Sequence, residues 1–547
     1  MVTYAQLRGI EPGQFQEAAD GWQKVSSCAS EAKDRLNDEI TAKLRAALSG
    51  DGVNQAIGRL QRLSRNFHYV QVESGLVRTA LDGLAAELRS AQRKLNTAVQ
   101  EAVDAGMTVK DDGTVQGQEG AKQETVQGFA DRIGDALREA GEADGRYAAT
   151  LRELITDADL EVTREDWADV ARDTGKVGDT AARDLGLGEV PKGKSPQENA
   201  DWWKSLTDEQ RADYVALYPA SVGALDGIPS DVRDEANRAS FESTRAKYQT
   251  ELAGIPPEPP RPAKLGDGTE EEKRWTDWWD QYGLRKEHLE KALNGMGAIQ
   301  DRFDATGKDG LPQAYLLGFD AEGDGRAIVA NGNPDMAEHT SVSVPGTNTA
   351  LGGAQRPLQD GAELWRSSNA LSGGRPVSTV TWIGYDTPPD IPSATVDSYA
   401  EEGAPALNRF LTGLETAQGG PEASHTTVVA HSYGTVLVGQ ASMQGDFPAD
   451  DLITVGSPGM NIESAEELET GKDHTWNQEA EGDAIPNWGR YVHGEGWGWT
   501  IPSDDDFGAH QMRTDTEGHG NYWSPRSESI TNQARVITGR YGDVTGA

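Results

Sequence analysis

Apolar residues in the first third of the chain recur at the spacing of one helix face. The clearest run alternates steps of four and three residues: Val77, Leu81, Leu84, Leu88, Ala91, Leu95, Ala98 and Ala102. This pattern is typical of helices that pack side by side in a hairpin or bundle. An earlier helical segment, residues 17–48, can supply the antiparallel partner across a turn at residues 50–52. We therefore predict an all-helical bundle over residues 1–185, interrupted by a small β-hairpin at residues 107–115.

Residues 186–310 combine the signals of a linker with those of short helices. Prolines between residues 191 and 196 and between 256 and 262 indicate extended spacers. Thr207, in contrast, is a good N-cap for a helix that follows it. We predict a linker and helical transition region here, which could also cap a neighbouring site.

From about residue 311 the hydrophobic pattern changes to short strands separated by helical stretches. The apolar and largely β-branched runs are residues 315–319, 326–330, 340–344, 378–383, 426–430, 452–456 and 474–480. An Asp324-Gly325 turn joins the first two runs as a hairpin. Buried strands that alternate with helices indicate a mostly parallel sheet covered on both faces. The predicted fold class of residues 311–547 is therefore α/β.

The composition narrows the possible partners. The chain of 547 residues has 89 acidic and 51 basic side chains, which gives a formal charge of −38. Such a surface repels phosphate backbones and anionic membrane faces, so we expect no nucleic-acid partner. Solubility is the simplest reason for the acidity. Because no apolar run approaches the ~18 residues of a membrane span, we also expect no integral membrane association.

The N-terminal residues lack the basic and apolar regions of a secretory signal. We therefore expect a cytoplasmic protein, with export by a signal-independent route as the alternative. Cys28 is the single cysteine, which excludes an intrachain disulfide. It has no neighbouring histidine, and this disfavours a catalytic role.

Residues 426–438 have the form of a strand, a sharp turn and a helix around Ser432. Small residues two positions before and after the serine, Ala430 and Gly434, allow the strand and the helix to pass closely. This pattern predicts a nucleophile elbow, in which Ser432 is the nucleophile of a serine hydrolase. The alternative is a buried strand followed by a turn with an incidental serine.

A serine nucleophile needs a base. In folds with a nucleophile elbow, the catalytic residues follow the chain order serine, acid, histidine. The histidines after Ser432 are His474, His493, His510 and His519. His519 lies in a turn-like segment directly before a predicted C-terminal helix at residues 527–538, where this fold delivers its histidine. We predict His519 as the base and keep His510 as the alternative.

The orienting acid should follow a strand, because ligands bind beyond the carboxyl ends of parallel strands. Asp483 follows the predicted strand 474–480 and adjoins a glycine turn, so we predict it as the acid. Asp473 precedes that strand and would lie at the opposite edge. Residues 504–506 form an acidic run that is typical of a solvated loop, although such a run could also hold a hard cation.

The oxyanion formed on the substrate needs N–H donors. The backbone N–H of Tyr433, which follows the nucleophile, is the first predicted donor. The loop after the third strand should supply the second, and we choose the N–H of Thr347, with Gly346 permitting close backbone approach. His431 is predicted to orient or pack beside the serine. This chemistry requires no cofactor and no metal, and we expect none.

These residues together resemble the actinobacterial DUF1023 family of α/β-hydrolase-fold proteins. The matching stretches are residues 343–347 (Ser-Val-Pro-Gly-Thr), 382–386 (Trp-Ile-Gly-Tyr-Asp), 430–434 (Ala-His-Ser-Tyr-Gly), 454–459 (Thr-Val-Gly-Ser-Pro-Gly) and 519–523 (His-Gly-Asn-Tyr-Trp). The resemblance extends from about residue 200 to the end and implies the α/β-hydrolase fold, but no established substrate. Ala430 stands where the family usually has glycine.

The N-terminal region is faintly similar to the WXG100-like helical hairpins of type VII secretion substrates. No Trp-x-Gly occurs at the expected turn between the helices, and Gly21-Trp22 stands elsewhere. The similarity implies possible export by that route and a protein partner bound through the N-terminal helices.

The leading functional hypothesis is a serine hydrolase that cleaves a small-molecule carboxylic ester or acyl substrate through an acyl-enzyme at Ser432. Thioester or amide cleavage would use the same residues. A second hypothesis is a catalytically silent hydrolase-fold scaffold linked to secretion. A third is a lipase, for which the Trp-rich residues 494–499 could form an apolar lid.

Overall fold

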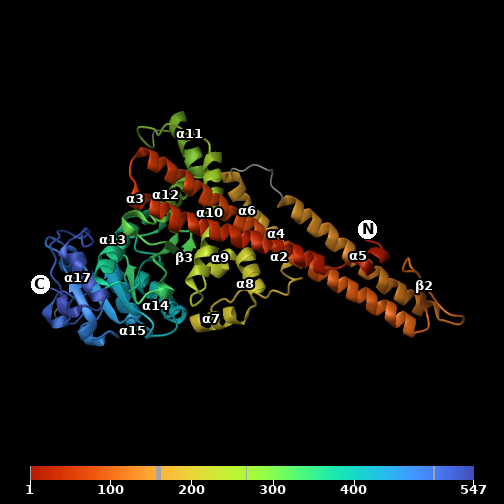
Figure 1. Ribbon diagram of the computed structural model, residues 1–547. Coiled ribbons are helices and arrows are strands. Elements are labelled where there is room, and N and C mark those ends of the chain that lie inside the picture. Colours follow the sequence, from red (N-terminus) through yellow and green to blue (C-terminus); the bar gives the residue numbers. More distant parts are fainter. Residues whose placement is uncertain (1, 155–161, 267, 497–498) are drawn as a thin grey trace. The chain divides into compact units, whose positions relative to one another are not determined.

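The computed structural model describes residues 2–154, 162–266, 268–496 and 499–547 (Figure 1). The chain forms two compact units. The helical unit consists of residues 1–35, 62–190 and 207–218, and the sheet unit of residues 36–61, 191–206 and 219–547. Residues 155–161 of the predicted bundle and residues 497–498 of the predicted lid lie outside the described residues.

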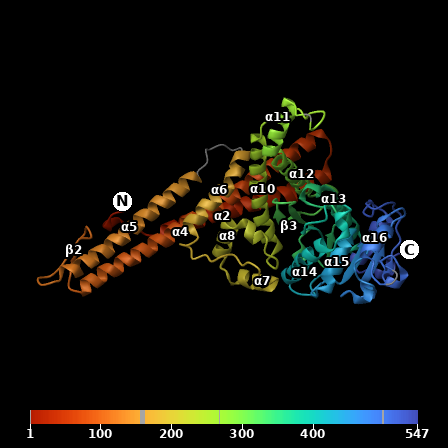
Figure 2. The same cartoon turned by 180° about the vertical axis from the view of Figure 1, so that it is seen from behind.

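The helical unit is built on two long antiparallel helices. Its helices are α1 (Tyr4–Gly9), α2 (Gly13–Asp34), most of α4 (Asp51–Asp104), α5 (Gln123–Glu153), α6 (Arg164–Ala181) and α8 (Asp208–Leu217). α4 and α5 run side by side in Figures 1 and 2, and ion pairs join Glu87 to Arg146 and Lys94 to Glu139. Alanines in both helices are fully buried between them, and their small side chains permit close packing.

The predicted seam is buried from Leu84 to Ala102, but its partner there is α5. The expected helix at residues 17–48 is present as an unbroken helical stretch from residue 13 to 47, in which a π-helical segment (Arg35–Thr41) joins α2 to α3 (Ala42–Ala47). α2 pairs with an earlier part of α4, where Ser26 Oγ donates to the Gln71 carbonyl at 2.9 Å. The helical stretch of residues 13–47 is shorter than the 54-residue α4, and α5 covers the later part of the seam.

Two smaller predictions for this unit are confirmed. Strands β1 (Thr108–Val109) and β2 (Val115–Gln116) form the antiparallel hairpin. Thr207 caps α8, where its side chain accepts a hydrogen bond from the Gln210 N–H.

The described residues of the sheet unit form eight strands. They are β3 (Ala314–Asp320), β4 (Arg326–Asn331), β5 (His339–Val344), β6 (Val377–Ile383), β7 (His425–His431), β8 (Asp451–Val455), β9 (Thr475–Gln478) and β10 (His510–Gln511), in the spatial order β10-β9-β8-β7-β5-β6-β4-β3. β4 pairs antiparallel with β3 and β6, and the remaining pairs are parallel. The predicted mostly parallel sheet is confirmed. β10 was not expected, because two residues are too few to show a period.

Helices cover both faces of this sheet, as the continuous apolar strands predict. α14 (Ser398–Gln418) and α15 (Tyr433–Met443) pack on one face, and α13 (Gln355–Leu371) and α17 (Glu528–Ile537) on the other. Successive side chains of a strand point to opposite faces. Val428 and Ala430 of β7 therefore join the first core, whereas Val429 joins the second.

The remaining helices of the sheet unit are α3 (Ala42–Ala47), α7 (Pro196–Ser205), α9 (Pro219–Gly223), α10 (Ser230–Gly254), α11 (Glu270–Trp278), α12 (Leu284–Asp304) and α16 (Ile485–His493). Among the described helices, none combines the length and the apolarity needed to cross a bilayer. The register of β5 and β7 places Val344 beside Ala430. The loop after β5 consequently begins next to the turn that carries Ser432.

Candidate active site

The turn between β7 and α15 has the geometry predicted for a nucleophile elbow. Ser432 has φ 54° and ψ −129°, a conformation that is strained for a residue with a side chain. Its N–H donates to the Val455 carbonyl at 3.0 Å, which ties the turn to β8. A Cβ atom on Gly434 would lie 2.4 Å from the Val344 carbonyl oxygen, so only glycine fits there. Ala430 is fully buried, and its single methyl group is accommodated.

Asp483 lies past the carboxyl end of β9 and is held by three donors. Its carboxylate accepts from His519 Nδ1 at 2.9 and 3.0 Å, from the Tyr522 hydroxyl at 2.7 Å and from the Ile485 N–H at 3.0 Å. Burial by itself would raise the pKa of Asp483. The hydrogen bonds outweigh burial and hold that pKa below its usual value. Asp483 is therefore ionised at neutral pH.

Side chains from two other elements hold the loop that carries His519. His431, at the end of β7, donates from Nε2 to the His519 carbonyl at 2.8 Å, and the two rings lie 4.6 Å apart. Burial lowers the pKa of His431 to about 4, so the ring is neutral. Arg356 of α13 donates to the Gly520 carbonyl. Both bonds hold the backbone that follows the His519 side chain, and the Gly518 N–H, which donates to the Glu481 carbonyl at 2.9 Å, holds the backbone before it.

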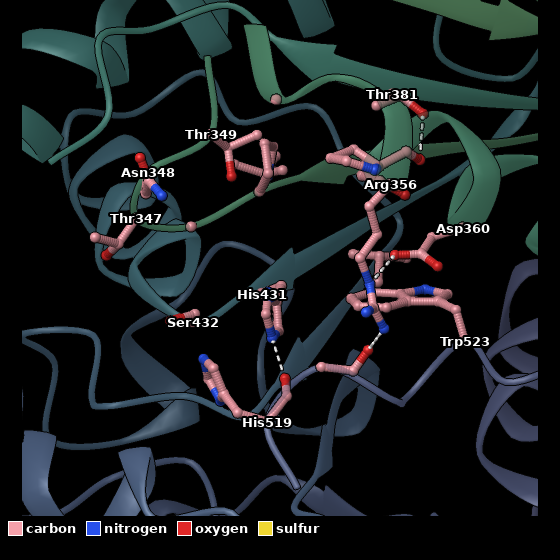
Figure 3. Close-up of a pocket in the computed structure, with 18 of the residues that line it drawn as sticks. Thr347, Asn348, Thr349, Arg356, Asp360, Thr381, His431, Ser432, His519 and Trp523 are labelled. Carbon is pink, nitrogen blue, oxygen red and sulfur yellow. Dashed lines mark hydrogen bonds and ion pairs between the residues drawn. The ribbon is translucent and has the colours of Figure 1, made fainter. Parts of the chain in front are cut away.

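Ser432 and His519 line one pocket of about 610 Å³. Figure 3 shows the His519 ring with one nitrogen on the side of Ser432. Both residues are described, and no hydrogen bond joins the Ser432 hydroxyl to that ring. Such bonds are often long in structures without substrate and tighten when it binds. The structure therefore brings the predicted serine, histidine and acid to one end of the sheet, with the histidine–acid bond formed.

The loop after β5 approaches the elbow closely. A Cβ atom on Gly346 would lie 2.7 Å from the Ser432 Cβ and 3.0 Å from the Tyr433 nitrogen. The N–H of Tyr433 lies in the first turn of α15, where a helix supplies no acceptor. Thr347, which follows Gly346 in this loop, lines the same pocket as Ser432. The next residue, Asn348, anchors the loop by donating its N–H to the Pro388 carbonyl at 2.7 Å.

One wall of the pocket is polar and was not predicted. Arg356 and Asp360 stand on the first turns of α13, with their charged groups 3.6 Å apart (Figure 3). Burial raises the pKa of Asp360 to about 6, even though Arg356 opposes the shift. Sequence reasoning also missed Tyr522, which supports Asp483. Its signal was present, because Tyr522 stands three residues after His519 within one of the motif stretches.

The other candidate histidines and acids contact residues outside the group of Ser432, Asp483 and His519. His474 contacts Asp451 at 3.0 Å at the amino ends of the strands, and the His510 ring lies 4.5 Å from that of Trp476. His493 is buried and its Nε2 lies 2.7 Å from the Ala394 carbonyl. Asp504 accepts from Arg490 at 2.9 Å. Within the described residues, no cluster of three or more histidine, cysteine or acidic side chains is arranged to hold a metal ion.

Comparison with known proteins agrees with this architecture. A family model described as alpha/beta hydrolase matches residues 320–492, a range that includes Ser432 and Asp483 and ends before His519. No solved structure matches the chain.

The chain is also similar to three mycobacterial proteins. The uncharacterized protein MT2140 of Mycobacterium tuberculosis is 24% identical over 98% of this chain and 87% of its own length. The uncharacterized protein Rv2079 of the same species is 27% identical over 64% of this chain, which spans only 57% of that relative. The uncharacterized protein Mb0988c of Mycobacterium bovis is 30% identical over 38% of this chain and 80% of its own length.

Proposed function

We propose that this chain, which belongs to the alpha/beta hydrolase family, is a serine hydrolase that cleaves carboxylic esters through an acyl-enzyme. One observation carries the proposal. His519, hydrogen-bonded to an ionised Asp483, lines the same pocket as a serine on a strained strand-to-helix turn. A serine on such a turn is the usual form of the nucleophile in this fold.

The proposed roles follow from the hydrogen bonds. Because His519 Nδ1 donates to Asp483, its Nε2 is free of the proton and can accept one from the Ser432 hydroxyl. The Ser432 oxygen then attacks the ester carbonyl, and His519 returns the proton to the departing alcohol. Water, activated by the same ring, hydrolyses the acyl-enzyme and regenerates Ser432.

The negative charge that forms on the carbonyl oxygen needs donors close to Ser432. We assign this role to the N–H groups of Tyr433 and Thr347, with Gly346 allowing the two backbones to approach. Losing one such donor typically lowers turnover by about 10²–10³-fold. The proposed chemistry needs neither a metal nor a cofactor.

A fluorophosphonate probe tests the proposal directly, because it labels an activated serine covalently. We expect the full chain to be labelled, and the Ser432→Ala variant to remain unlabelled. Ser393→Ala, which alters a half-buried serine in a 3-10 turn, is the matched control and should label normally. If the folded chain is not labelled at all, the proposal is wrong.

A silent scaffold is the second candidate, because no hydrogen bond joins Ser432 to His519 in the structure. On that reading, the N-terminal helices would bind a protein partner and the pocket would be inert. A folded chain that neither labels nor hydrolyses short esters, while Ser432→Ala retains every partner in pull-downs, would favour it. Thioester or amide cleavage is distinguished by assaying matched thioester and anilide substrates.

A further inference from the structure

Large apolar side chains are exposed on α16 and on two segments that contact it. Six of them form what we call the apolar shelf: Ile391, Val396, Trp488, Tyr491, Val492 and Trp499. Trp488 is 77% exposed, Tyr491 64% and Ile391 63%. Tyr491 and Trp499 contact each other, with ring centroids 5.3 Å apart. Exposed apolar clusters of this kind mark binding surfaces more often than isolated exposed residues do.

The orientation of α16 exposes three of the shelf residues. Trp488, Tyr491 and Val492 are spaced three and four residues apart, so they share the outward face of this helix. The inward face carries Gly489, where a Cβ atom would lie 2.2 Å from the Pro458 Cβ, and the buried His493. Turning the aromatic face inward would force side chains into Pro458. The helix is therefore docked by its small face, and its apolar face stays in solvent.

The segment 391–396 connects the shelf to the pocket. The ring of His493 contacts the Ala394 carbonyl at 2.7 Å, which joins α16 to the segment 391–396. The Val396 carbonyl at the end of this segment accepts from the Tyr433 hydroxyl at 2.5 Å. Ile391, at its start, lines the pocket that contains Ser432. An extended apolar group that leaves the pocket past Ile391 thus meets the shelf.

The charges on the shelf favour an uncharged occupant. Arg490 is the one arginine of α16, and it is paired with Asp504 at 2.9 Å. His493 Nδ1 faces Asp397 at 3.1 Å. The chain as a whole carries a formal charge of −38, which repels anionic lipid surfaces. Within the described residues of α16, the basic side chains are thus paired with acidic groups, which disfavours an anionic headgroup.

We propose that the apolar shelf binds the acyl chain of the substrate, so that the preferred substrates are uncharged esters of long-chain fatty acids. This inference rests on the proposed serine hydrolase function. The ester carbonyl would lie at Ser432, and the chain would leave the pocket past Ile391 toward α16. Each methylene that leaves water on binding favours the long chain.

The test compares p-nitrophenyl butyrate with p-nitrophenyl dodecanoate, both below their aggregation concentrations. In the double variant Trp488→Ser/Tyr491→Ser, we expect kcat/KM for the dodecanoate to fall about ten-fold or more, because several buried methylenes lose their contacts. The butyrate value should change less than about two-fold, since a short chain does not reach the shelf. Met336→Ser is the matched control, because Met336 is 73% exposed but lies before the amino end of β5, whereas the pocket lies beyond its carboxyl end.

A binding measurement provides a readout without turnover. Calorimetry of Ser432→Ala with dodecyl maltoside below its micelle concentration should show binding, and the double substitution on the shelf should abolish it. Equal kcat/KM losses on both esters, or none, would overturn the shelf proposal while leaving the hydrolase intact. Failure of the unaltered chain to hydrolyse either ester would instead refute the proposed function. Dimerisation of the chain that is lost in the shelf variant would show that a second copy covers the shelf, and would also overturn the inference.

Discussion

Replacing Tyr522 by phenylalanine isolates the support that Asp483 receives. The tyrosine is fully buried, and its hydroxyl donates to Asp483 at 2.7 Å while it accepts from the Ala480 N–H at 2.9 Å. The variant keeps the ring and loses both bonds. A hydrogen bond to a charged group contributes about 1.5–3 kcal/mol, and an unpaired buried N–H costs about 1–3 kcal/mol. We expect the free energy of unfolding to fall by about 3 kcal/mol.

The pH dependence has a definite sign. The folded pKa of Asp483 lies below its usual value, so its contribution to stability is present above the unfolded pKa of about 3.9. That contribution is lost as pH falls through the folded pKa. The stability difference between the unaltered chain and Tyr522→Phe should therefore be largest at neutral pH and shrink below about pH 4. Urea unfolding at a series of pH values measures it.

Tyr541→Phe is the matched control for this experiment. Tyr541 also donates to a buried carboxylate at 2.7 Å, that of Asp451, but at the amino ends of the strands. Both variants should lose stability. Only Tyr522→Phe should lower ester turnover, by about ten-fold for each 1.4 kcal/mol lost from the transition state. Equal turnover in the two variants would refute the view that Tyr522 positions Asp483 for catalysis.

Three further predictions concern the elbow, the oxyanion loop and the opposite edge of the sheet. Gly346→Ala should lower the rate of fluorophosphonate labelling by about 10²-fold or more, because its Cβ would lie 2.7 Å from the Ser432 Cβ; labelling at the normal rate would contradict the close approach. Ala430→Val should destabilise the fold by about 1–3 kcal/mol through overpacking between β7 and α15, whereas Ala430→Gly should label normally; thermal unfolding measures the first effect. Asp451→Asn should cost about 3–5 kcal/mol, because Asp451 is buried and bonded to His425 at 2.8 Å. Burial lowers the pKa of His425, but bonding to Asp451 raises it above its usual value, while the pKa of Asp451 is held low. The stability lost in Asp451→Asn should thus diminish as pH rises through the folded pKa of His425, and also as pH falls through the folded pKa of Asp451. A loss in urea unfolding that does not change with pH would contradict the pairing.

Local pattern was enough to predict the elements that carry the chemistry. The strand before Ser432, the small residues around it and the helix after it are all adjacent in sequence, and the structure has each of them. The alternation of apolar runs with helical stretches likewise predicted the mostly parallel sheet. The catalytic roles of Ser432, Asp483 and His519 remain predictions that the labelling experiment tests.

Features that depend on contacts between distant segments could not be predicted from the local sequence pattern. The seam of α4 could not identify α5 as its partner, because an a/d pattern specifies a face and not the helix that covers it. β10 is too short to have a period, and its pairing with β9 comes from the folded chain. The exposed face of α16 was likewise hidden, because its aromatic spacing alone is equally typical of a buried helix.

The sequence by itself determined the alternation of the longer strands with helices along the chain, the elbow at Ser432 and the chain order of an acid and a histidine after it. Period and turn chemistry act over a few residues, so they can be read directly from the chain. Only the tertiary structure decided that Asp483, His519 and Tyr522 meet, with hydrogen bonds of 2.7–3.0 Å between elements far apart in sequence. Those contacts depend on how the sheet and its covering helices pack, which no local pattern specifies. The same packing leaves the apolar face of α16 in solvent.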